Sequence, residues 1–399
     1  MTTGEPARVD GPLAGVRVLE LAGKGAAAYC AMLLADMGAE VLRVDRPEHV
    51  RAAADAPRGA PPRDLRRGRR SAGIDLKHPD GTAFVLELVA RADVVMEGYR
   101  PGVAERLGLG PDACRAVKPD VVYGRVTGWG NAGPYANRVG HDIDYIAVTG
   151  LLDAVGPPDH PVPPLNLAGD GAGGMIAAFG IVCALHQSRT TGVGVTVDSA
   201  MIDAAHSLMT GFHLRAPIGQ WTERRQANKI DGGAPFYNVY ETLDGRHVAV
   251  GAIEPHFYAA LLALCGLDAD ELPEQWDEAE WPAMRARFAA VFNTRTRDRW
   301  VSDAAGTDSC LAPVLTLSEA PDDAHNAARG TFVEVDGVTQ PAPVPRFGPE
   351  PVTVRRGAAR DGQHTREVLS DWGVSNERLG DLIERGIVVE LDRPAMAAG

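Results

Sequence analysis

The sequence has 399 residues, which is enough for large buried cores and, at ordinary domain sizes, for two domains. Apolar residues make up 45% and charged residues 23%, as in globular proteins, and a formal net charge of −13 disfavours nonspecific binding to nucleic acid. The five cysteines are scattered and never form a Cys-x-x-Cys pair, which argues against a structural zinc or a disulfide framework. No run is predicted to span a bilayer, and the polar N-terminus lacks a signal-peptide core, so we expect a cytoplasmic protein with no membrane or nucleic-acid partner.

The part of the chain from residue 14 to about 127 alternates β-rich and helical runs. Such alternation predicts a parallel sheet with right-handed crossovers, and therefore an α/β domain. We expect strands in VRVLELA, AEVLRVD, SAGIDLK, ADVVMEGYR and VVYGRVTGW, and helices in AAYCAMLLADMG, GTAFVLELVARA and PDACRAVKP.

The first of these strands runs into two glycines, Gly23 and Gly25, which precede a helix. The second strand ends in Asp45, about twenty residues later, where a dinucleotide-binding enzyme places the acid that binds a ribose. A lone glycine pair after a strand is a weak signal. The residues alone therefore leave open whether this unit binds NAD or serves another ligand.

The rest of the chain predicts a second, smaller domain. GWGNAGPYANRVG is expected to be a loop, whereas GDGAGGMIAAFGIVCALHQSR and VTVDSAMIDAAHSLMTGFHLR are expected to be helices. Strands around Asp244-Gly245 and a following helix indicate an α+β unit, and the C-terminal tail is rich in helix. The expected division is a large domain at 1–200 completed by 346–399, a small domain at 238–325, and linkers at 201–237 and 326–345.

The stretch from Arg51 to Arg70 opposes the acidic balance of the chain, because it carries seven arginines and only two acids. It is either a solvated loop or an anion site for a polyphosphate, to which the forked donors of arginine are well suited.

Three polar positions stand out in runs that otherwise resemble the lining of a pocket: His141, Asp170 and Glu254. Taken singly, they are most simply a structural histidine, a helix N-cap and a cap before Pro255. Together they supply an imidazole, a carboxylate at a glycine-rich helix start, and an acid able to orient the imidazole. Because Gly-x-Ser-x-Gly and His-Glu-x-x-His motifs are absent, acid/base chemistry or a carboxylate nucleophile remains, and no metal is expected.

Long segments of the chain resemble the family III CoA-transferase superfamily and, within it, the α-methylacyl-CoA racemases. The matching segments extend from near residue 11 to about 260 and include GPLAGVRVLELAG, LLADMGAEVLRVDRP, EGYRPGVAERLGLGP, VTGWGNAGPYANRVGHDIDY, PVPPLNLAGDGAGGM and GRHVAVGAIEPHFY. The resemblance implies that the Rossmann-like unit binds coenzyme A instead of NAD. It also implies an interlocked homodimer, an acyl-CoA substrate and no cofactor beyond the coenzyme A of that substrate.

The resemblance further implies which residues bind the coenzyme. These are Arg46, Ile74, Asp75, Leu76, Lys77, Gly98, Tyr99, Arg100, Arg106, Gly140, Asp142 and Tyr145.

Two activities in this family would use Asp170 differently. A racemase of 2-methylacyl-CoA thioesters, an activity of lipid metabolism, needs two bases on opposite faces of the α-carbon, and His141 with Asp170 would be that pair. A transferase would use Asp170 as a nucleophile. Family transferases typically lack a histidine at the position of His141, which favours the racemase.

In the racemase, Glu254 would orient His141. The backbone amides around Asp170 are expected to hold the enolate oxygen.

One segment departs from the family pattern. Where racemases of the family usually carry residues resembling Gly-Pro-Gly-Pro, this chain has Lys24 to Tyr29. The change is either drift in a loop or a sign that Lys24 and Tyr29 face the acyl or pantetheine end of the pocket. The second interpretation implies a more polar acyl group.

Overall fold

The computed structural model describes residues 11–21, 23–55, 65–348 and 353–391. The chain forms two compact units. The first comprises Met1–Thr149, Leu165–Leu208 and Ala327–Gly399, and the second comprises Gly150–Pro164 and Met209–Asn326.

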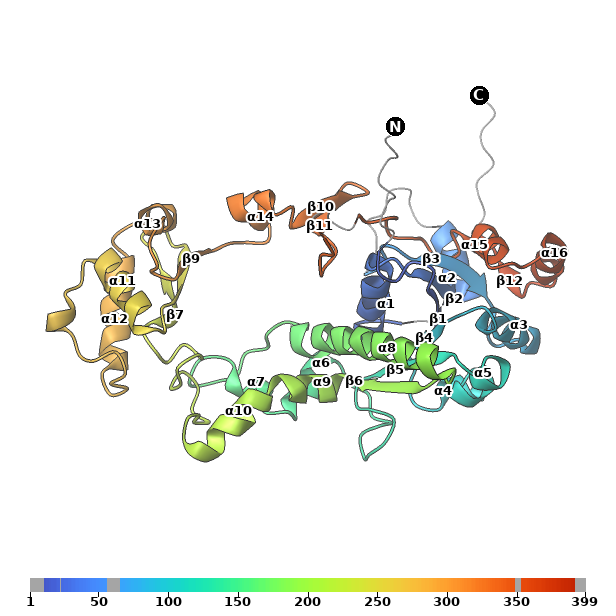
Figure 1. Cartoon of the computed structure of the whole chain (residues 1–399), viewed down its shortest axis with the longest axis horizontal. Helices are drawn as coiled ribbons and strands as arrows, with labels where there is room; N and C mark the ends of the chain where they lie inside the picture. Colours follow the sequence, from blue (N-terminus) through green and yellow to red (C-terminus); the bar gives the residue numbers. More distant parts are fainter. Residues whose placement is uncertain (1–10, 22, 56–64, 349–352, 392–399) are drawn as a thin grey trace, which may run out of the picture. The chain divides into compact units, whose positions relative to one another are not determined.

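A seven-stranded sheet forms the centre of the first unit, in the order β12-β3-β2-β1-β4-β5-β6 (Figure 1). Its strands pair in parallel except β12, which is antiparallel to β3. The α/β fold and the first five predicted strands are therefore confirmed. The strands are β1 (Arg17–Leu21), β2 (Glu40–Asp45), β3 (Arg70–Ile74), β4 (Val94–Glu97), β5 (Val122–Thr127), β6 (Thr196–Ala200) and β12 (Val388–Val389).

The prediction of a helix throughout residues 195–215 is wrong at its start, where β6 pairs with β5. Val195 and Val197 pack against the core while Thr196 and Asp198 are exposed, and this alternation is the signature of a strand. The helical pattern is correct only beyond β6, in α9 (Met201–Leu208) and α10 (Thr210–Arg215).

Helices cover both faces of the sheet. Successive residues of a strand point to opposite faces, and the apolar side chains on both faces are buried against helices. In β1, Val18 faces the cluster that contains α1 (Ala26–Asp36) and α8 (Ala172–Thr191). Leu19 and Leu21 face the cluster built with α3 (Pro79–Val89), α5 (Pro111–Val117), α15 (Thr365–Asp371) and α16 (Asn376–Glu384). The same unit contains α2 (Pro47–Ala54), α4 (Val103–Arg106), α6 (Asp142–Ala147), α14 (Ala324–Ala328, at the boundary) and the hairpin of β10 (Phe332–Val335) and β11 (Val338–Pro341).

One helical stretch, Leu167–Thr191, is 25 residues long with a mean hydropathy of 1.5, so by length and composition it could span a bilayer. The expectation that no run reaches this length was wrong. A single such helix is weak evidence for a membrane protein, because a core helix passes the same test. Here Ala177, Ile181 and Ala184 pack into the core beneath the sheet.

The second unit is a small α+β structure. Its antiparallel sheet has the order β7-β8-β9, with the predicted hairpin turn at Asp244-Gly245 between β7 and β8. Aromatic side chains, including Phe236, Phe288 and Trp300, fill its core. Its elements are α7 (Leu151–Ala154), β7 (Tyr237–Glu241), β8 (His247–Gly251), α11 (Pro255–Cys265), α12 (Trp281–Phe292), α13 (Arg297–Ala304) and β9 (Leu311–Val314).

The strand order of the large sheet reverses between β1 and β4. The chain adds β2 and β3 on one side of β1, and then β4, β5 and β6 on the other. In open α/β sheets, ligands bind at such a switch point, outside the carboxyl ends of the strands. The loops that follow β1, β2 and β4 are therefore where a ligand is expected.

Candidate active site

Asp170 lies in a single π-helical turn, Leu167–Gly171, that leads into α8. It is not the N-cap of that helix, because the N-cap position belongs to Gly171. The carboxylate of Asp142 holds this turn: its Oδ2 accepts hydrogen bonds from the amides of Gly169 and Asp170, both at 2.7 Å. The simplest interpretation of Asp170 as a helix cap is therefore wrong.

His141 immediately precedes Asp142 and is the N-cap residue of α6. Its backbone amide donates to Asp144 Oδ2 at 2.8 Å, which fixes the start of the helix, and its side chain is exposed. The buried Asp142 carboxylate accepts a hydrogen bond from the backbone amide of Asp170. It therefore connects the chain at His141 with the turn that carries Asp170.

The amides around Asp170 do not form an open oxyanion site. Those of Gly169 and Asp170 donate to Asp142, and that of Gly171 donates to the carbonyl of Asn166 at 3.2 Å. The prediction that these amides hold an enolate oxygen is therefore wrong. Asp142, which the family resemblance assigned to coenzyme binding, uses Oδ2 to support the turn.

Burial dominates the titration of Asp142. Removal from water raises the pKa of this carboxyl, although the hydrogen bonds from the amides of Asp170 and Gly169 lower it. The hydrogen bonds from these two backbone amides are strongest when the Asp142 carboxylate is ionised. Protonation of Asp142 would therefore loosen the turn that carries Asp170.

The carboxylate of Asp170 is half-buried and lies against the loop that follows β1. A Cβ atom added at Gly25 would be 2.8 Å from Asp170 Oδ1 and 2.9 Å from Oδ2. The side-chain amide Nδ2 of Asn166 also donates a hydrogen bond to Asp170 Oδ2 at 3.2 Å. Gly25, at φ +52°, therefore permits a close approach that a residue with a side chain would prevent.

The buried side chain of Tyr145 packs against the loop that precedes His141. Its ring is so close to Gly128 and Gly140 that a Cβ on either residue would collide with it. Its hydroxyl donates to the carbonyl of Gly140, and Trp129 packs edge-on at 4.9 Å. Burial raises the pKa of Tyr145, the charge of Asp170 adds to this, and the charge of Arg100 opposes it. In this structure, Tyr145 therefore shapes the site through packing.

Most of the residues predicted to bind coenzyme A lie at or just beyond the carboxyl ends of β2, β3 and β4, whereas Gly140, Asp142 and Tyr145 come after β5, at the start of α6. Burial raises the pKa of Tyr99 to about 12, opposed by the charge of Arg46, so these two side chains lie within electrostatic reach of each other. Ile74 differs from the rest, because its side chain belongs to the core and its backbone pairs with β12. Among the predicted residues, the exposed ones are Arg46, Lys77, Gly98, Arg100 and Arg106.

Four arginines of the arginine-rich stretch, at positions 66, 67, 69 and 70, do not form an open anion site. Arg67 pairs with Asp36 at 2.7 Å, Arg69 pairs with Glu20 at 2.7 Å, and both guanidinium groups are buried. Arg70 pairs with Glu40 and Asp371, and Arg66 pairs with Asp361. Arg58 and Arg63 lie outside the described residues. The polyphosphate hypothesis is therefore wrong for these four arginines, which are internal ion-pair partners.

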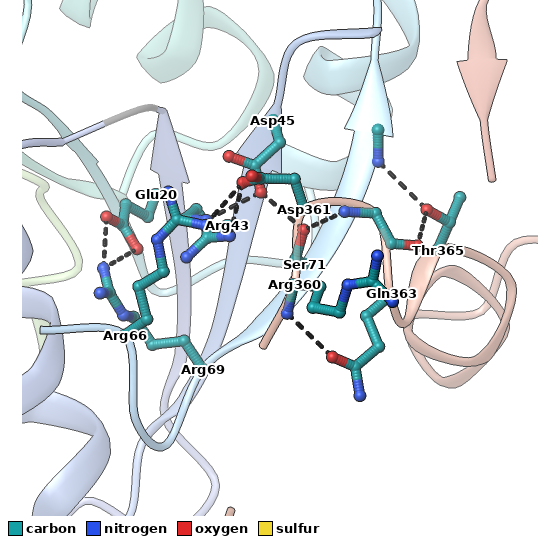
Figure 2. Close-up of polar contacts among 12 residues, drawn as sticks. Glu20, Arg43, Asp45, Arg66, Arg69, Ser71, Arg360, Asp361, Gln363 and Thr365 are labelled. Atoms are coloured by element: carbon teal, nitrogen blue, oxygen red, sulfur yellow. Dashed lines mark hydrogen bonds and ion pairs between the residues drawn. The ribbon is translucent and has the colours of Figure 1, made fainter. Parts of the chain in front are cut away.

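Asp361 and the residues after it tie the C-terminal segment to the strands that carry the predicted coenzyme site (Figure 2). Asp361 Oδ1 accepts from Arg43 at 3.0 Å and from Arg66 at 2.9 Å. Ser71 donates to Asp45 Oδ2 at 2.6 Å and accepts from the amide of Gly362 at 2.6 Å. Asp45, which a dinucleotide enzyme would use for a ribose, is therefore engaged inside the protein.

Sequence reasoning missed Glu97, the last residue of β4, which is only 4% exposed at the switch point. Its Oε2 accepts a hydrogen bond from the backbone amide of Tyr99 at 2.6 Å. Burial raises the pKa of Glu97 to about 7, and the bond from Tyr99 and the charge of Arg125 only partly oppose this. The signal in the sequence was an acid at the end of an otherwise apolar strand.

Glu254 belongs to the second unit, where it occupies the N-cap position of α11 before Pro255. Its side chain makes no capping hydrogen bond in that helix. Its predicted role beside His141 stays a prediction. Among the described residues, no group of three or more His, Cys, Asp and Glu side chains has the arrangement of a metal site.

Comparison with known proteins identifies the family. Residues 13–365 match the model of CoA-transferase family III. The chain is 42% identical to the mouse α-methylacyl-CoA racemase over 384 residues, covering 94% of this chain and 97% of the relative. It is 40% identical to the human enzyme of the same name, with coverage of 93% and 96%.

The chain belongs to CoA-transferase family III. Its members include transferases, and the chain is 30% identical to the β subunit of succinyl-CoA–L-malate CoA-transferase from Chloroflexus aurantiacus, with coverage of 94% and 98%. The fold matches the crystal structure of a CaiB/BaiF family protein from Brucella suis, with a TM-score of 0.77, 24% identity and coverage of 91% and 99%. A Mycobacterium tuberculosis structure matches with a TM-score of 0.73, 26% identity and coverage of 89% and 98%.

Replacing Gly25 with alanine should impair turnover more than folding. The new Cβ would meet the Asp170 carboxylate at 2.8 Å, and displacing a reacting group by about 1 Å can cost on the order of 100-fold in rate. The matched control is Gly15→Ala, because Gly15 also has a positive φ but open space around its Cβ position. We expect kcat for an acyl-CoA substrate to fall in G25A and not in G15A. Equal kcat values in the two variants would contradict the contact.

Replacing Glu97 with glutamine should change how stability depends on pH. The folded-state pKa of about 7 lies above the ordinary value of 4.5, so the contribution of Glu97 is fully present below pH 4.5 and lost as pH rises through 7. Relative to wild type, the unfolding free energy of E97Q should therefore rise by roughly 3 kcal/mol across this window. Urea unfolding at several pH values measures it, with Glu87→Gln, an exposed partner of Arg378, as the control. Parallel curves for E97Q and wild type would rule out the shift.

Proposed function

We propose that the protein is a racemase of 2-methylacyl-CoA thioesters. The relatives named α-methylacyl-CoA racemase support this, because they match at 40 and 42% identity over more than nine tenths of the chain. The site supports it as well, since a racemase needs two groups that can each take and return a proton. His141 and Asp170 are groups of this kind.

In the proposed reaction, one of the two bases removes the proton from the α-carbon, and the thioester becomes an enolate. The other group, which starts protonated, gives its proton to the opposite face of the same carbon. The thioester is restored with inverted configuration, and the two bases have exchanged protonation states. No bond to coenzyme A is broken and no acceptor acid is consumed.

The observation that carries the proposal is the connection between the two bases. Asp142 is the residue after His141, and its Oδ2 accepts hydrogen bonds from the backbone amides of Gly169 and Asp170, both at 2.7 Å. Because His141 precedes Asp142, this contact connects the backbone at His141 with the turn that carries Asp170, although 28 residues separate Asp142 from Asp170. A nucleophilic aspartate alone would not need an imidazole at this position.

A transferase is the alternative, and the relatives named CoA-transferases at about 30% identity are the reason to test for it. In that reaction Asp170 would attack the thioester carbonyl and form an acyl-enzyme anhydride, with release of the CoA thiolate. His141 would then be dispensable, and a free acid would be needed as acceptor.

The decisive experiment is incubation with single epimers of a 2-methylacyl-CoA in heavy water, without an acceptor acid. Wild type should incorporate α-deuterium and convert either single epimer into a mixture of both epimers. His141→Ala and Asp170→Ala should each abolish racemisation, and each should retain slow exchange from only one epimer, with opposite preferences, because one base survives on each face. His160→Ala, a change at an exposed histidine of the second unit, is the control and should behave as wild type. Mass spectrometry and chiral chromatography report the outcome.

A different pattern would support the transferase. Asp170→Ala would then lose all activity while His141→Ala kept it, and hydroxylamine would trap an acyl-enzyme. Wild type that exchanges no α-deuterium but passes CoA to a free acid would overturn the racemase proposal.

We also propose that the protein acts as a homodimer through the outer face of α8. This face exposes apolar side chains that a soluble monomer would leave in water, including Met175 at 57% and Phe179 at 68%. Ile176 and Val182 extend the stripe along the helix. An apolar patch of this kind favours burial against a partner, and the proposed partner is a second copy of the chain.

Sedimentation velocity at micromolar concentration should give the mass of a dimer. Phe179→Glu should shift the protein toward monomer, because it places a charge in the proposed interface. Val117→Glu is the matched control, since Val117 is also exposed but lies on α5, whose core lies on the other face of the sheet. A monomeric wild type, or a V117E variant that dissociates as readily as F179E, would contradict the proposal.

We further propose that coenzyme A enters only as part of the substrate, bound in part by Arg46 and Arg100, and that the protein acts in the cytoplasm. All five cysteines are free, and Cys30, Cys114 and Cys265 are buried, which suits a reducing compartment.

A further inference from the structure

Lys24 lies in the loop after β1, where the strand order of the large sheet reverses. The loops after β1 and β4 flank the crevice in which an open α/β sheet binds its ligand. The Lys24 side chain is exposed, and among the described residues its ammonium group makes no hydrogen bond or ion pair. Within the described part of the chain, the Lys24 ammonium group at the switch point therefore has no internal partner.

The loop that carries Lys24 is packed against the site of Asp170. Gly25, the next residue, lies so close to the Asp170 carboxylate that a Cβ would be 2.8 Å from Oδ1. The amide of Tyr29 donates to the carbonyl of Gly25 at 3.0 Å, and the Tyr29 ring lies against Gly174 at the start of α8. Lys24 is thus one residue from a contact with the proposed base, on a flexible four-carbon stem.

Other cations near these strand ends contrast with Lys24. Arg43 and Arg69 are buried and paired with acids, so they cannot meet a ligand. Arg46 and Arg100 follow β2 and β4, and they are the residues proposed to bind the phosphates of coenzyme A. The Lys24 loop lies between these loops in the strand order, and its next residue, Gly25, contacts Asp170, which the acyl portion of the thioester must reach for its α-proton to be removed.

We propose that Lys24 is a specificity residue for an acyl chain that carries a carboxylate. The inference rests on the proposed racemase function and refines its substrate class to 2-methylacyl-CoA thioesters of dicarboxylic acids. The ammonium group pairs with the distal carboxylate and takes no part in proton transfer at the α-carbon. A carboxylate is the anion that fits this role, because the acyl chain is the part of the thioester that varies while the phosphates belong to the coenzyme.

The test compares each carboxylated thioester with a neutral isostere. Methylsuccinyl-CoA, linked at the carbonyl next to the methyl-bearing carbon, is paired with 2,4-dimethylpentanoyl-CoA, in which an isopropyl group replaces the carboxylate. 2-Methylglutaryl-CoA, with the same linkage, is paired with 2,5-dimethylhexanoyl-CoA. For at least one pair, wild type should favour the carboxylate by about tenfold or more in kcat/KM for racemisation, the size expected for a charge-assisted hydrogen bond.

Lys24→Met should remove this preference by lowering kcat/KM for the carboxylated thioester while leaving the isostere within about twofold. Lys24→Arg should retain part of it, because the charge remains. Lys118→Met is the matched control. Lys118 is paired with Asp120 and precedes β5, so it lies toward the amino ends of the strands. Its loss should leave kcat/KM unchanged for both the carboxylated thioester and the isostere.

Binding of the same thioesters, measured by calorimetry, gives a readout that does not depend on turnover. If wild type racemises none of the four thioesters, the racemase proposal fails, and the binding preference and its loss in K24M still decide the role of Lys24. If wild type binds and racemises the isosteres as well as the carboxylates, the inference about Lys24 fails and the racemase proposal stands. If K24M weakens the binding of unacylated CoA, the lysine contacts the coenzyme and the inference is overturned.

Discussion

The candidate site depends on two hydrogen bonds, from the amides of Gly169 and Asp170 to the carboxylate of Asp142. A helix start leaves amides without intrahelical partners, and α8 begins with a π-helical turn in which two such amides point at one buried acid. The negative charge of Asp142 also suits the positive end of the α8 dipole. Since His141 precedes Asp142 in the chain, the same carboxylate connects the backbone at His141 with the turn that carries Asp170.

This arrangement requires glycine where chain segments approach the acids most closely. A Cβ at Gly169 would be 2.5 Å from Asp142 Oδ2, and one at Gly25 would be 2.8 Å from Asp170 Oδ1. The two glycines therefore have similar roles in distant parts of the sequence. Gly169 allows the turn to approach Asp142, and Gly25 allows the loop after β1 to approach Asp170, the proposed base. Neither purpose is visible locally, because each depends on a contact made only in the folded chain.

Local patterns predicted the first five strands correctly, since alternation of β-rich and helical runs is a property of neighbouring residues. The strand β6 was missed because its alternation, Val195 to Ser199, is short and merges into a helix. β12 has only two residues and is defined by its pairing with β3, which no local pattern encodes. Among the site residues, His141 and Asp170 were found as polar positions in apolar surroundings, whereas the support from Asp142 required the tertiary structure.

The arginine-rich stretch shows how burial separates ligand-binding charges from structural ones. Counting charges suggested an anion site, but Arg67 and Arg69 are buried against Asp36 and Glu20, acids that come from other strands and helices. A buried arginine requires a fixed counter-charge, and once paired it has no free donors to offer a phosphate. What distinguishes Arg46 is that its side chain stays 54% exposed just beyond β2, although its neighbour Asp45 is locked into the network with Arg43 and Ser71. The network holds the end of β2 in place while the Arg46 side chain stays exposed, so the buried ion pairs would support the proposed binding of coenzyme A by fixing the backbone next to Arg46.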